Sequence, residues 1–469
     1  MKTGGLADVS AALPAALRAK GADVRVLLPG YRQVLSSLKN KRQIARISNL
    51  PGLGIVRLLS ARMPDSDVPL IIIDYPAFYD REGGPYINNT GQNWPDNALR
   101  FGLLSRIAAI LGSDATPLAW HPDIVHGNDW QSGLAPAYLS FEQGRTAATI
   151  MTIHNLAYQG IFPPETVAQL ALPPACFNMQ GVEYYGNLSF LKAGLFYADH
   201  LTTVSPTYAR EIQTEALGFG LQGLLSQRAA HLTGIVNGVD TKDWNPASDA
   251  FLPKTYSATR TAGKAASKTA LQQHLNLPVS GEIPLIGIVS RITHQKGLDL
   301  LLDIAPQLIQ EPAQIVILGS GDPEMEKAFK HLAKQYPLHF AAIIGFDEGL
   351  SHLVEAGSDI FLMPSRFEPC GLNQMYSMLY GTPPVVNATG GLADTVTDCT
   401  PASLQDDTAT GFVLKELSAE HLLLTAKKAI SAYHDKKTWR RLQLNGMRRN
   451  FSWGESADAY LALYAKLVS

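Results

Sequence analysis

The chain has 469 residues, of which 46% are hydrophobic and 17% charged, values typical of a globular protein with a large core. The formal net charge of −2 gives no indication of a nucleic-acid or anionic-membrane partner, and no stretch approaches the roughly 18 to 20 apolar residues of a membrane span. The chain length predicts about two to three domains. Three cysteines are too few for a disulfide framework, so we expect a reducing, cytoplasmic location.

Short apolar segments in the first half predict strands at 23–29, 55–60, 70–74, 123–126, 148–153 and 201–204. They lack strict alternation of polar and apolar residues, which is typical of parallel strands covered on both faces. The intervening stretches are long enough for helices. We therefore predict a doubly wound, Rossmann-like α/β domain over residues 1–238.

The second half repeats this pattern after a turn-rich boundary at 234–246, which contains Asn237-Gly238 and Pro246. Strands are predicted at 283–290, 313–319, 339–344, 359–363 and 383–386. These segments predict a second Rossmann-like domain over residues 239–448. The tail, 449–469, is expected to be an amphipathic helix that crosses back to the first domain.

The hexapeptide TGGLAD occurs twice, at Thr3–Asp8 and at Thr389–Asp394. In each copy a Gly-Gly pair precedes a helical stretch, and glycines before a helix N-terminus allow a backbone to approach an anion closely. A tight strand-to-helix turn explains one copy equally well. One copy in each half favours a shared role, in which each domain contributes a glycine loop to a cleft at the carboxyl ends of its strands.

Two cations follow a predicted strand in the segment VSRITHQKGLDLL (289–301). Arg291 and Lys296 lie beside a helix start in a nearly neutral chain, which suits a diphosphate. The alternative is a solvated helix start with ordinary surface charges.

The segment MPSRFEPCGLNQ (363–374) places Glu368 after an apolar strand and before a helix. A carboxylate there can bind sugar hydroxyls or stabilise an oxocarbenium ion, or simply cap the helix. The amides of Gly371 and Leu372 are placed for phosphate oxygens. We expect Cys370 to be a small packed residue and not a nucleophile.

In the first half, VHGNDW (125–130) and MTIHNLAYQG (151–160) each end a strand in polar residues. Asp129 and His154 are the ionisable members, and Asn155 lies beside His154. A neutral histidine and an asparagine can hydrogen-bond a polyol, whereas an isolated histidine is more often structural.

Aromatic residues and missing metal motifs complete the pattern. Tyr86, Trp130 and Tyr158 are candidates for stacking on acceptor sugar rings, although most aromatics belong to a core. No HxxxH or CxxC spacing occurs, so we expect no metal and no other cofactor.

Together, KTGGLADV, HGNDW, TIHNLAYQG, NGVD, SRITHQKGLDL, SRFEPCGLNQ and TGGLADTV resemble bacterial glycogen synthases and plant starch synthases, in order and over essentially the whole chain. The resemblance implies a GT-B fold, with two Rossmann-like domains facing across a cleft. It also implies metal-independent transfer of glucose from ADP-glucose to the 4-hydroxyl at the non-reducing end of an α-1,4-glucan such as glycogen, with retention of configuration. A homo-oligomer is left open.

The resemblance also implies roles for individual residues. His154, Glu368 and Asp129 match catalytic-centre positions, and Asn155, Asn237 and Cys370 match positions near the sugar. Phe346 is expected to stack on adenine. Tyr86, Trp130 and Tyr158 remain the acceptor candidates. The donor and its diphosphate are expected to be bound by Lys2, Gly4, Gly5, Arg291, Lys296, Gly371, Leu372, Asn373, Thr389, Gly390 and Gly391.

This chain departs from the family pattern at three places. A strand of about a dozen residues is expected before the KTGGL loop, whereas the sequence begins at Met1, which predicts a first domain truncated at its start with an unpaired sheet edge. Tyr376 stands where many broader relatives carry a second glutamate. Phe346 stands where tyrosine is common.

Three alternatives follow. A UDP-glucose-dependent relative would share the chemistry, and a glucan-binding or regulatory protein impaired by the missing strand would keep the cleft without catalysis. A nicotinamide-dependent dehydrogenase is disfavoured, because no GxGxxG follows an N-terminal strand with an acidic residue about 20 positions later.

Overall fold

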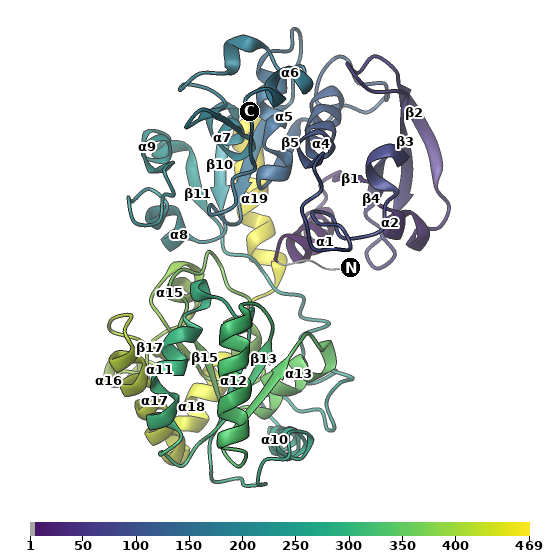
Figure 1. The fold of residues 1–469 in the computed structure, drawn as a ribbon. Helices are drawn as coiled ribbons and strands as arrows, with labels where there is room; N and C mark the ends of the chain where they lie inside the picture. Colours follow the sequence, from purple (N-terminus) through teal and green to yellow (C-terminus); the bar gives the residue numbers. More distant parts are fainter. Residues whose placement is uncertain (1–4) are drawn as a thin grey trace. The chain divides into compact units, whose positions relative to one another are not determined.

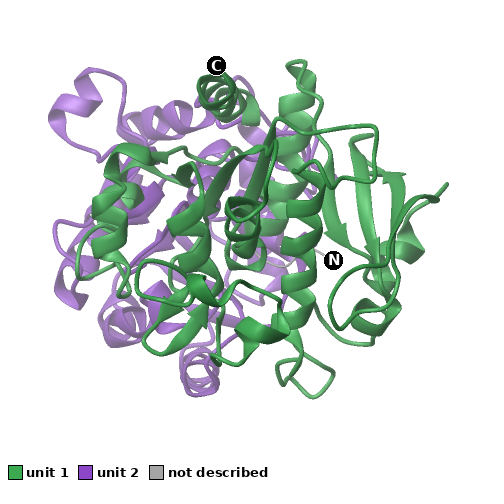
Figure 2. Cartoon of the chain, turned by 90° about the horizontal axis from the view of Figure 1, so that it is seen from above, with its two compact units in different colours: residues 1–238, 453–469 green, residues 239–452 purple. Residues whose placement is uncertain are grey.

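The computed structural model describes residues 5–469, which divide into two compact units. Unit 1 contains residues 1–238 and 453–469, and unit 2 contains residues 239–452 (Figure 2). Each unit has its own β-sheet core covered by helices, as Figure 1 shows for the labelled elements. None of the helices in the described part of the chain is long and apolar enough to cross a membrane.

Within residues 5–238 and 453–469, unit 1 contains two four-stranded sheets and a small three-stranded one. The first has the order β1-β4-β3-β2, the second β11-β10-β6-β5, and the third β7-β9-β8. Their bounds are β1 (Val26–Pro29), β2 (Arg42–Ile47), β3 (Val56–Arg62), β4 (Pro69–Asp74), β5 (Ile124–Asn128), β6 (Ala148–Ile153), β7 (Ile161–Phe162), β8 (Glu183–Tyr184), β9 (Asn187–Ser189), β10 (His200–Thr203) and β11 (Leu232–Gly234). Among the described residues, β1 and β5 are edge strands of their sheets.

One strand direction differs from the sequence-based expectation. The segment 55–60 was expected among parallel strands, but β3 is antiparallel to both β2 and β4. The physical reason is the connection: only residues 63–68 link β3 to β4, which is too short for the crossover that a parallel pair requires. The second sheet is parallel throughout, as predicted.

The helices of unit 1 are α1 (Gly5–Ala19), α2 (Arg32–Ser37), α3 (Pro76–Tyr79), α4 (Asn97–Leu111), α5 (Leu134–Ser140), α6 (Thr166–Gln169), α7 (Phe190–Tyr197), α8 (Pro206–Glu211), α9 (Gln222–Gln227) and α19 (Trp453–Val468). The C-terminal helix α19 packs on α1 through a cluster that includes Val9, Leu13 and Tyr460. The Tyr464 hydroxyl lies 2.7 Å from Nδ1 of the partly buried His126 in β5. Apolar packing and this polar contact therefore join the chain's last helix to unit 1.

Unit 2 contains one six-stranded parallel sheet in the order β14-β13-β12-β15-β16-β17. Its strands are β12 (Leu285–Val289), β13 (Gln314–Gly319), β14 (Phe340–Ile344), β15 (Ile360–Met363), β16 (Pro384–Val386) and β17 (Phe412–Val413). All six residues of β13 are buried, which explains the apolar run Ile315–Gly319 that follows its first residue, Gln314. The flanking helices are α10 (Ala262–His274), α11 (Leu298–Leu308), α12 (Pro323–Gln335), α13 (Glu348–Gly357), α14 (Asn373–Leu379), α15 (Gly390–Thr395), α16 (Pro401–Gln405), α17 (Ala419–His434) and α18 (Lys436–Met447).

Candidate active site

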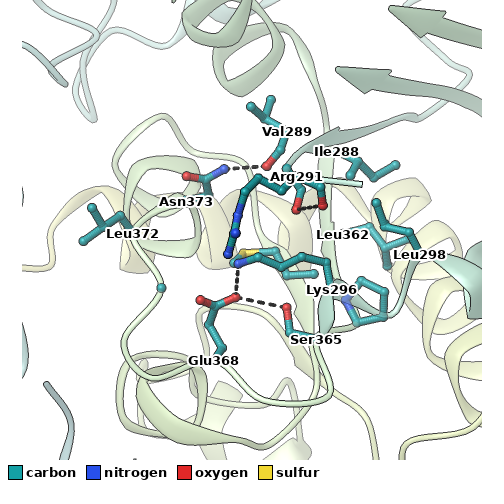
Figure 3. Close-up of a pocket in the computed structure, with 14 residues that line it drawn as sticks. Ile288, Val289, Arg291, Lys296, Leu298, Leu362, Ser365, Glu368, Leu372 and Asn373 are labelled. Atoms are coloured by element: carbon teal, nitrogen blue, oxygen red, sulfur yellow. Dashed lines mark hydrogen bonds and ion pairs between the residues drawn. The ribbon is translucent and has the colours of Figure 1, made fainter. Parts of the chain in front are cut away.

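A pocket of about 180 Å³ opens in unit 2 at the carboxyl ends of β12 and β15 (Figure 3). This is the edge at which parallel α/β sheets bind ligands, because the loops after neighbouring strands converge there. The polar side chains in its lining include Arg291, Lys296, Ser365, Glu368 and Asn373. Six predicted residues of this half line the cavity, namely Arg291, Lys296, Glu368, Gly371, Leu372 and Asn373, whereas Phe346, Cys370, Thr389, Gly390 and Gly391 are not part of its lining.

Lys296 is the last residue of a short 3₁₀ turn, His294–Lys296, that follows β12. Gly297 then adopts a left-handed conformation, with φ of 66°, before α11 begins. A Cβ at Gly297 would lie 1.9 Å from the carbonyl oxygen of Pro364, so the turn can approach the loop after β15 only with glycine at this position. The KG dipeptide thus places the Lys296 stem against the loop that carries Glu368.

Lys296 and Glu368 form an ion pair inside the pocket. The Lys296 ammonium donates to Oε2 of Glu368 at 2.5 Å, and the Ser365 hydroxyl donates to the same oxygen at 3.1 Å (Figure 3). Glu368 is 6% exposed and Ser365 1% exposed. Because a buried carboxylate needs charged or hydrogen-bonding partners, this arrangement keeps Glu368 fixed at the pocket floor.

A second ion pair fastens the Glu368 loop to the segment that carries Lys296. The Arg366 guanidinium donates to both carboxylate oxygens of Asp299, at 2.7 and 2.6 Å, and to the carbonyl of His294 at 2.7 Å. A bidentate arginine–carboxylate pair restricts orientation as well as distance. The two segments that supply Lys296 and Glu368 are therefore held in a fixed relation.

Gly371, Leu372 and Asn373 form the far wall of the pocket, where α14 begins. Gly371 has φ of 70°, a conformation that favours glycine. The Asn373 amide donates to the carbonyl of Val289 at 2.6 Å and so ties α14 to the end of β12. Cys370 is buried, with 6% exposure.

The second TGGLAD copy packs directly on the Glu368 loop. The Gly391 N–H donates to the carbonyls of Glu368 and Pro369 at 3.1 and 3.2 Å. A Cβ at Gly390 would lie 2.0 Å from the Glu368 carbonyl oxygen, and one at Gly391 would lie 2.0 Å from that of Cys370. Thr389 is buried beside them. These glycines are thus required for close backbone packing, whatever ligand they face.

Two further residues of unit 2 have distinct surroundings. Phe346 follows β14 and is 85% exposed, so its ring is available for stacking. Tyr376 is buried and stacks on Trp244 with ring centroids 3.8 Å apart. The residue at the second-glutamate position is therefore an aromatic packing residue in this chain.

In unit 1, Asp129 and His154 come together at the carboxyl ends of β5 and β6. Oδ1 of Asp129 accepts the backbone N–H of His154 at 2.8 Å, and His154 Nε2 lies 2.9 Å from Oδ1 of Asn128. Because an amide oxygen only accepts, Nε2 carries the proton and Nδ1 of the neutral ring remains an acceptor. Asp129 has φ of 56°, an uncommon conformation for a residue other than glycine and a frequent feature of functional loops.

Burial changes the protonation of both groups. It raises the pKa of Asp129 to about 7, against the lowering effect of the backbone N–H groups of His154 and Asn155. Burial, together with a smaller effect of the nearby His126, lowers the pKa of His154 to about 3. His154 is therefore a neutral hydrogen-bonding group at physiological pH and not a cation.

The remaining predicted residues of unit 1 have mixed environments. Asn155 is partly buried and turns back to its own loop, accepting the Ala157 N–H at 3.1 Å. Asn237 is 7% exposed, and its Oδ1 makes no hydrogen bond within the described residues. Tyr86 and Trp130 pack against the apolar core of this unit, whereas Tyr158 is 50% exposed.

The first TGGLAD copy lies partly outside the described residues, which excludes Lys2 and Gly4. Gly5 is the exposed first residue of α1, and a Cβ there would meet nothing within 4 Å. Residues 5–469 contain no group of three or more His, Cys, Asp or Glu side chains that could hold a metal ion.

Several residues that shape the site were not singled out from the sequence. Asn128 orients the His154 ring, Ser365 binds Glu368, and Arg366 pairs with Asp299. Asn128 and Ser365 lie next to or within the quoted motifs, so their position was the available indication. The Arg366–Asp299 pair spans 67 residues and has no local indication in the sequence.

Comparisons with known proteins agree with this architecture. Residues 1–227 match the family described as "Starch synthase catalytic domain", and residues 273–449 match "Glycosyl transferases group 1". The chain is 59% identical to the glycogen synthase of Nitrosospira multiformis over 471 residues, which cover 100% of this chain and 95% of the relative. It is 57% identical to that of Nitrosomonas eutropha, with coverage of 100% and 94%.

Solved structures extend the comparison to the fold. The catalytic domain of Arabidopsis thaliana starch synthase IV, bound to ADP and acarbose, superposes with a TM-score of 0.89 at 30% identity, covering 100% of this chain and 96% of that one. Sucrose-phosphate synthase from Thermosynechococcus elongatus gives a TM-score of 0.57 at 18% identity over 97% and 91% of the chains, a likeness of fold alone. The predicted class, two Rossmann-like α/β domains of the GT-B type, is confirmed.

Proposed function

The chain belongs to the bacterial glycogen synthase family, and we propose that it transfers glucose from ADP-glucose to the 4-hydroxyl at the non-reducing end of an α-1,4-glucan, with retention of configuration. The observation that carries this proposal is the pocket of unit 2, where Arg291, Lys296 and Glu368 line one cavity in a fold shared with a starch synthase bound to ADP and acarbose. Full-length similarity to glycogen synthases supports the same activity.

We assign the unit 2 pocket to the diphosphate of the donor and the sugar carbon attached to it. Its volume of about 180 Å³ is below the roughly 300 to 1,000 Å³ of pockets that enclose whole ligands, so it suits one part of a nucleotide sugar. Arg291 and Lys296 supply positive charge there. The amides at Gly371 and Leu372 add donors for phosphate oxygens.

Lys296 then contributes to the departure of ADP. As the glycosidic bond to phosphate breaks, negative charge grows on the diphosphate, and a fixed cation stabilises that charge without reorganising solvent. Glu368 balances Lys296 at 2.5 Å in the structure described. In the reaction, its carboxylate is proposed to stabilise the positive charge that develops at the anomeric carbon or to bind a sugar hydroxyl.

In unit 1, we propose that His154 binds the transferred glucose as a neutral group. Its Nε2–H donates to Oδ1 of Asn128, so Nδ1 is the atom available to accept a hydrogen bond from a sugar hydroxyl. Asp129 is proposed to position this loop, because its carboxylate accepts the His154 backbone N–H at 2.8 Å.

The remaining assignments follow the family pattern. Phe346 is proposed to stack on adenine and Tyr158 on the acceptor, and both rings are at least half exposed, at 85% and 50%. Lys2, Gly4 and Gly5 are proposed to face the donor together with Thr389, Gly390 and Gly391. Asn155, Asn237 and Cys370 are proposed to lie near the glucose. A cytoplasmic location and independence of metal remain predictions of the same proposal.

A transfer assay tests the function. The full chain is incubated with glycogen and with ADP-glucose labelled in the glucose. The label incorporated into the polymer is measured as the label that α-1,4-specific amylases release from it. We expect incorporation by the wild type and its loss in Glu368→Ala. The matched control, Glu420→Ala, removes an exposed carboxylate of α17 and is expected to behave as wild type.

Two outcomes would overturn the proposal. Incorporation from UDP-glucose but not from ADP-glucose would reject the donor. Retained glycogen binding without incorporation from either donor would reject the transferase activity. Incorporation by Glu368→Ala at the wild-type rate would remove Glu368 from the mechanism while leaving the activity established.

A further inference from the structure

A hairpin in unit 1 presents two large side chains almost entirely to solvent. Met179 is 79% exposed and Tyr185 is 78% exposed. Tyr185 lies in the two-residue turn between β8 and β9, and Met179 lies in the loop that leads into β8. Tyr158, one of the three acceptor candidates of the same unit, is 50% exposed.

This hairpin is held firmly by the residues beneath it. The ammonium of Lys192, which is 8% exposed, donates to the carbonyl of Met179 at 2.9 Å and to that of Glu183. The Gly186 N–H donates to Oε1 of Glu183 at 2.6 Å, and β8 pairs with β9. The exposed side chains are therefore displayed on an ordered backbone.

The conformation of the turn makes tyrosine an unexpected choice at its tip. Tyr185 and Gly186 have φ of 48° and 80°, the combination for which Asn-Gly is favoured. A bulky residue with positive φ is an outlier that carries strain. Within the chain the only aromatic contact of Tyr185 among the described residues is the edge-on ring of Tyr184, 4.7 Å away. Packing inside the protein does not account for the exposed ring.

The surrounding chemistry indicates which ligand fits. Between residues 177 and 191 the only charged side chain is Glu183, and one of its oxygens is already bonded to the turn. The other polar side chains of this segment include the amides of Asn178, Gln180 and Asn187, of which Asn178 and Asn187 also donate to the carbonyls of Ala175 and Tyr185. An anionic polymer would require cations, which this segment lacks. Aromatic rings next to amides suit a neutral, hydroxyl-rich chain.

A shared anchor links the hairpin to the His154 loop. The carbonyl of Phe219 accepts the Tyr184 hydroxyl at 2.7 Å and the Gln159 amide at 2.9 Å. The carbonyl of Gln159 in turn accepts the Leu191 N–H at 3.0 Å. The hairpin and the loop that follows β6 are therefore parts of one hydrogen-bonded layer of unit 1.

We propose that this hairpin, with Tyr185 at its tip, is a docking site for an α-1,4-glucan chain, with the Tyr185 ring stacking on a glucose unit. The proposal rests on the proposed function for the identity of the glucan. It adds a binding element outside the residues assigned to the donor and to the transferred sugar.

Tyr185→Asn tests the proposal, because asparagine accepts the positive φ of the turn while removing the ring. Glycogen affinity is measured by affinity electrophoresis, with KM values for glycogen and ADP-glucose and the Tm. We expect the glycogen Kd and KM to rise about 3- to 10-fold, an effect the size of one aromatic contact. The KM of ADP-glucose should stay constant and the Tm should stay constant or rise. Leu338→Asn, which removes an exposed side chain from unit 2, is the matched control and should bind glycogen as wild type does.

Tyr185→Phe keeps the ring and should lose less than about twofold in glycogen affinity. Wild-type glycogen affinity in Tyr185→Asn would overturn the docking site. An equal loss in Tyr185→Phe, or a loss accompanied by a lower Tm, would overturn the stacking role. If the wild type binds glycogen but transfers no glucose, the proposed function fails, and the affinity of Tyr185→Asn still decides the docking site.

Discussion

The candidate residues of unit 1 and those of unit 2 balance their charges in different ways. In unit 2, Lys296 and Glu368 form an ion pair at 2.5 Å, reinforced by the nearby Arg366–Asp299 pair. In unit 1, burial lowers the pKa of His154 to about 3 and raises that of Asp129 to about 7, so its groups are neutral or close to it. Charge suits a diphosphate, and neutral hydrogen bonds suit a hydroxyl-rich sugar.

Lys296→Ala should have the largest effect, because it removes a cation from the unit 2 pocket. We expect ADP-glucose binding to weaken roughly 10- to 100-fold, the size of a lost charge-assisted hydrogen bond. Isothermal titration with ADP-glucose measures the change, and Lys327→Ala on the exposed face of α12 is the control. An unchanged donor affinity would contradict the diphosphate role.

Asp129→Asn tests the unit 1 side through stability. Because the fold raises the pKa of Asp129, it favours the protonated carboxyl over the carboxylate. The free energy of unfolding therefore falls as pH rises from about 4, the pKa of an unfolded aspartate, to about 7. We expect Asp129→Asn to be more stable than wild type above pH 7, by on the order of 2 kcal/mol, with the difference shrinking toward pH 4. Urea unfolding at several pH values measures it. A stability difference that does not vary with pH would show that the fold leaves the pKa of Asp129 at its ordinary value.

His154→Ala should lower kcat by about 10-fold with a smaller change in KM, if its hydrogen bond strengthens in the transition state. Because the folded histidine stays neutral above pH 5, the pH profile of kcat between pH 5.5 and 8 should keep its shape in the variant. His121→Ala, at an exposed position, is the control. Loss of an ionisation near pH 6.5 in the variant would contradict a neutral role for His154.

Ser365→Ala should have the smallest effect, because it removes one of the two hydrogen bonds to Glu368 Oε2 and leaves Lys296 in place. We expect kcat to fall about 3- to 10-fold, consistent with a single buried hydrogen bond. Ser365→Thr, which keeps the hydroxyl, should recover most of the rate. Equal losses in both variants would assign Ser365 to packing alone.

The sequence predicted those strands and site residues that are indicated by a short, continuous stretch of the chain. Buried parallel strands such as β13 are read from continuous apolar runs, and Lys296 and Glu368 from their places at strand ends. Strand β2 (Arg42–Ile47) was not predicted, because it is partly exposed to solvent and contains charged residues in place of a continuous apolar run. The direction of β3 depends on which strands pair, and the Arg366–Asp299 pair depends on segments far apart in the sequence. Such features arise from tertiary contacts and have no local pattern.

The tight fit of Gly390 and Gly391 against the carbonyls of Glu368, Pro369 and Cys370 bears on how this protein can be re-engineered. Backbone meets backbone there, with no side chain between them to absorb a mismatch. A chimera that imports the loop at 363–373 from a relative must therefore import the segment at 387–396 with it. Grafted alone, either piece would displace the other, and the carboxylate of Glu368 would move with it.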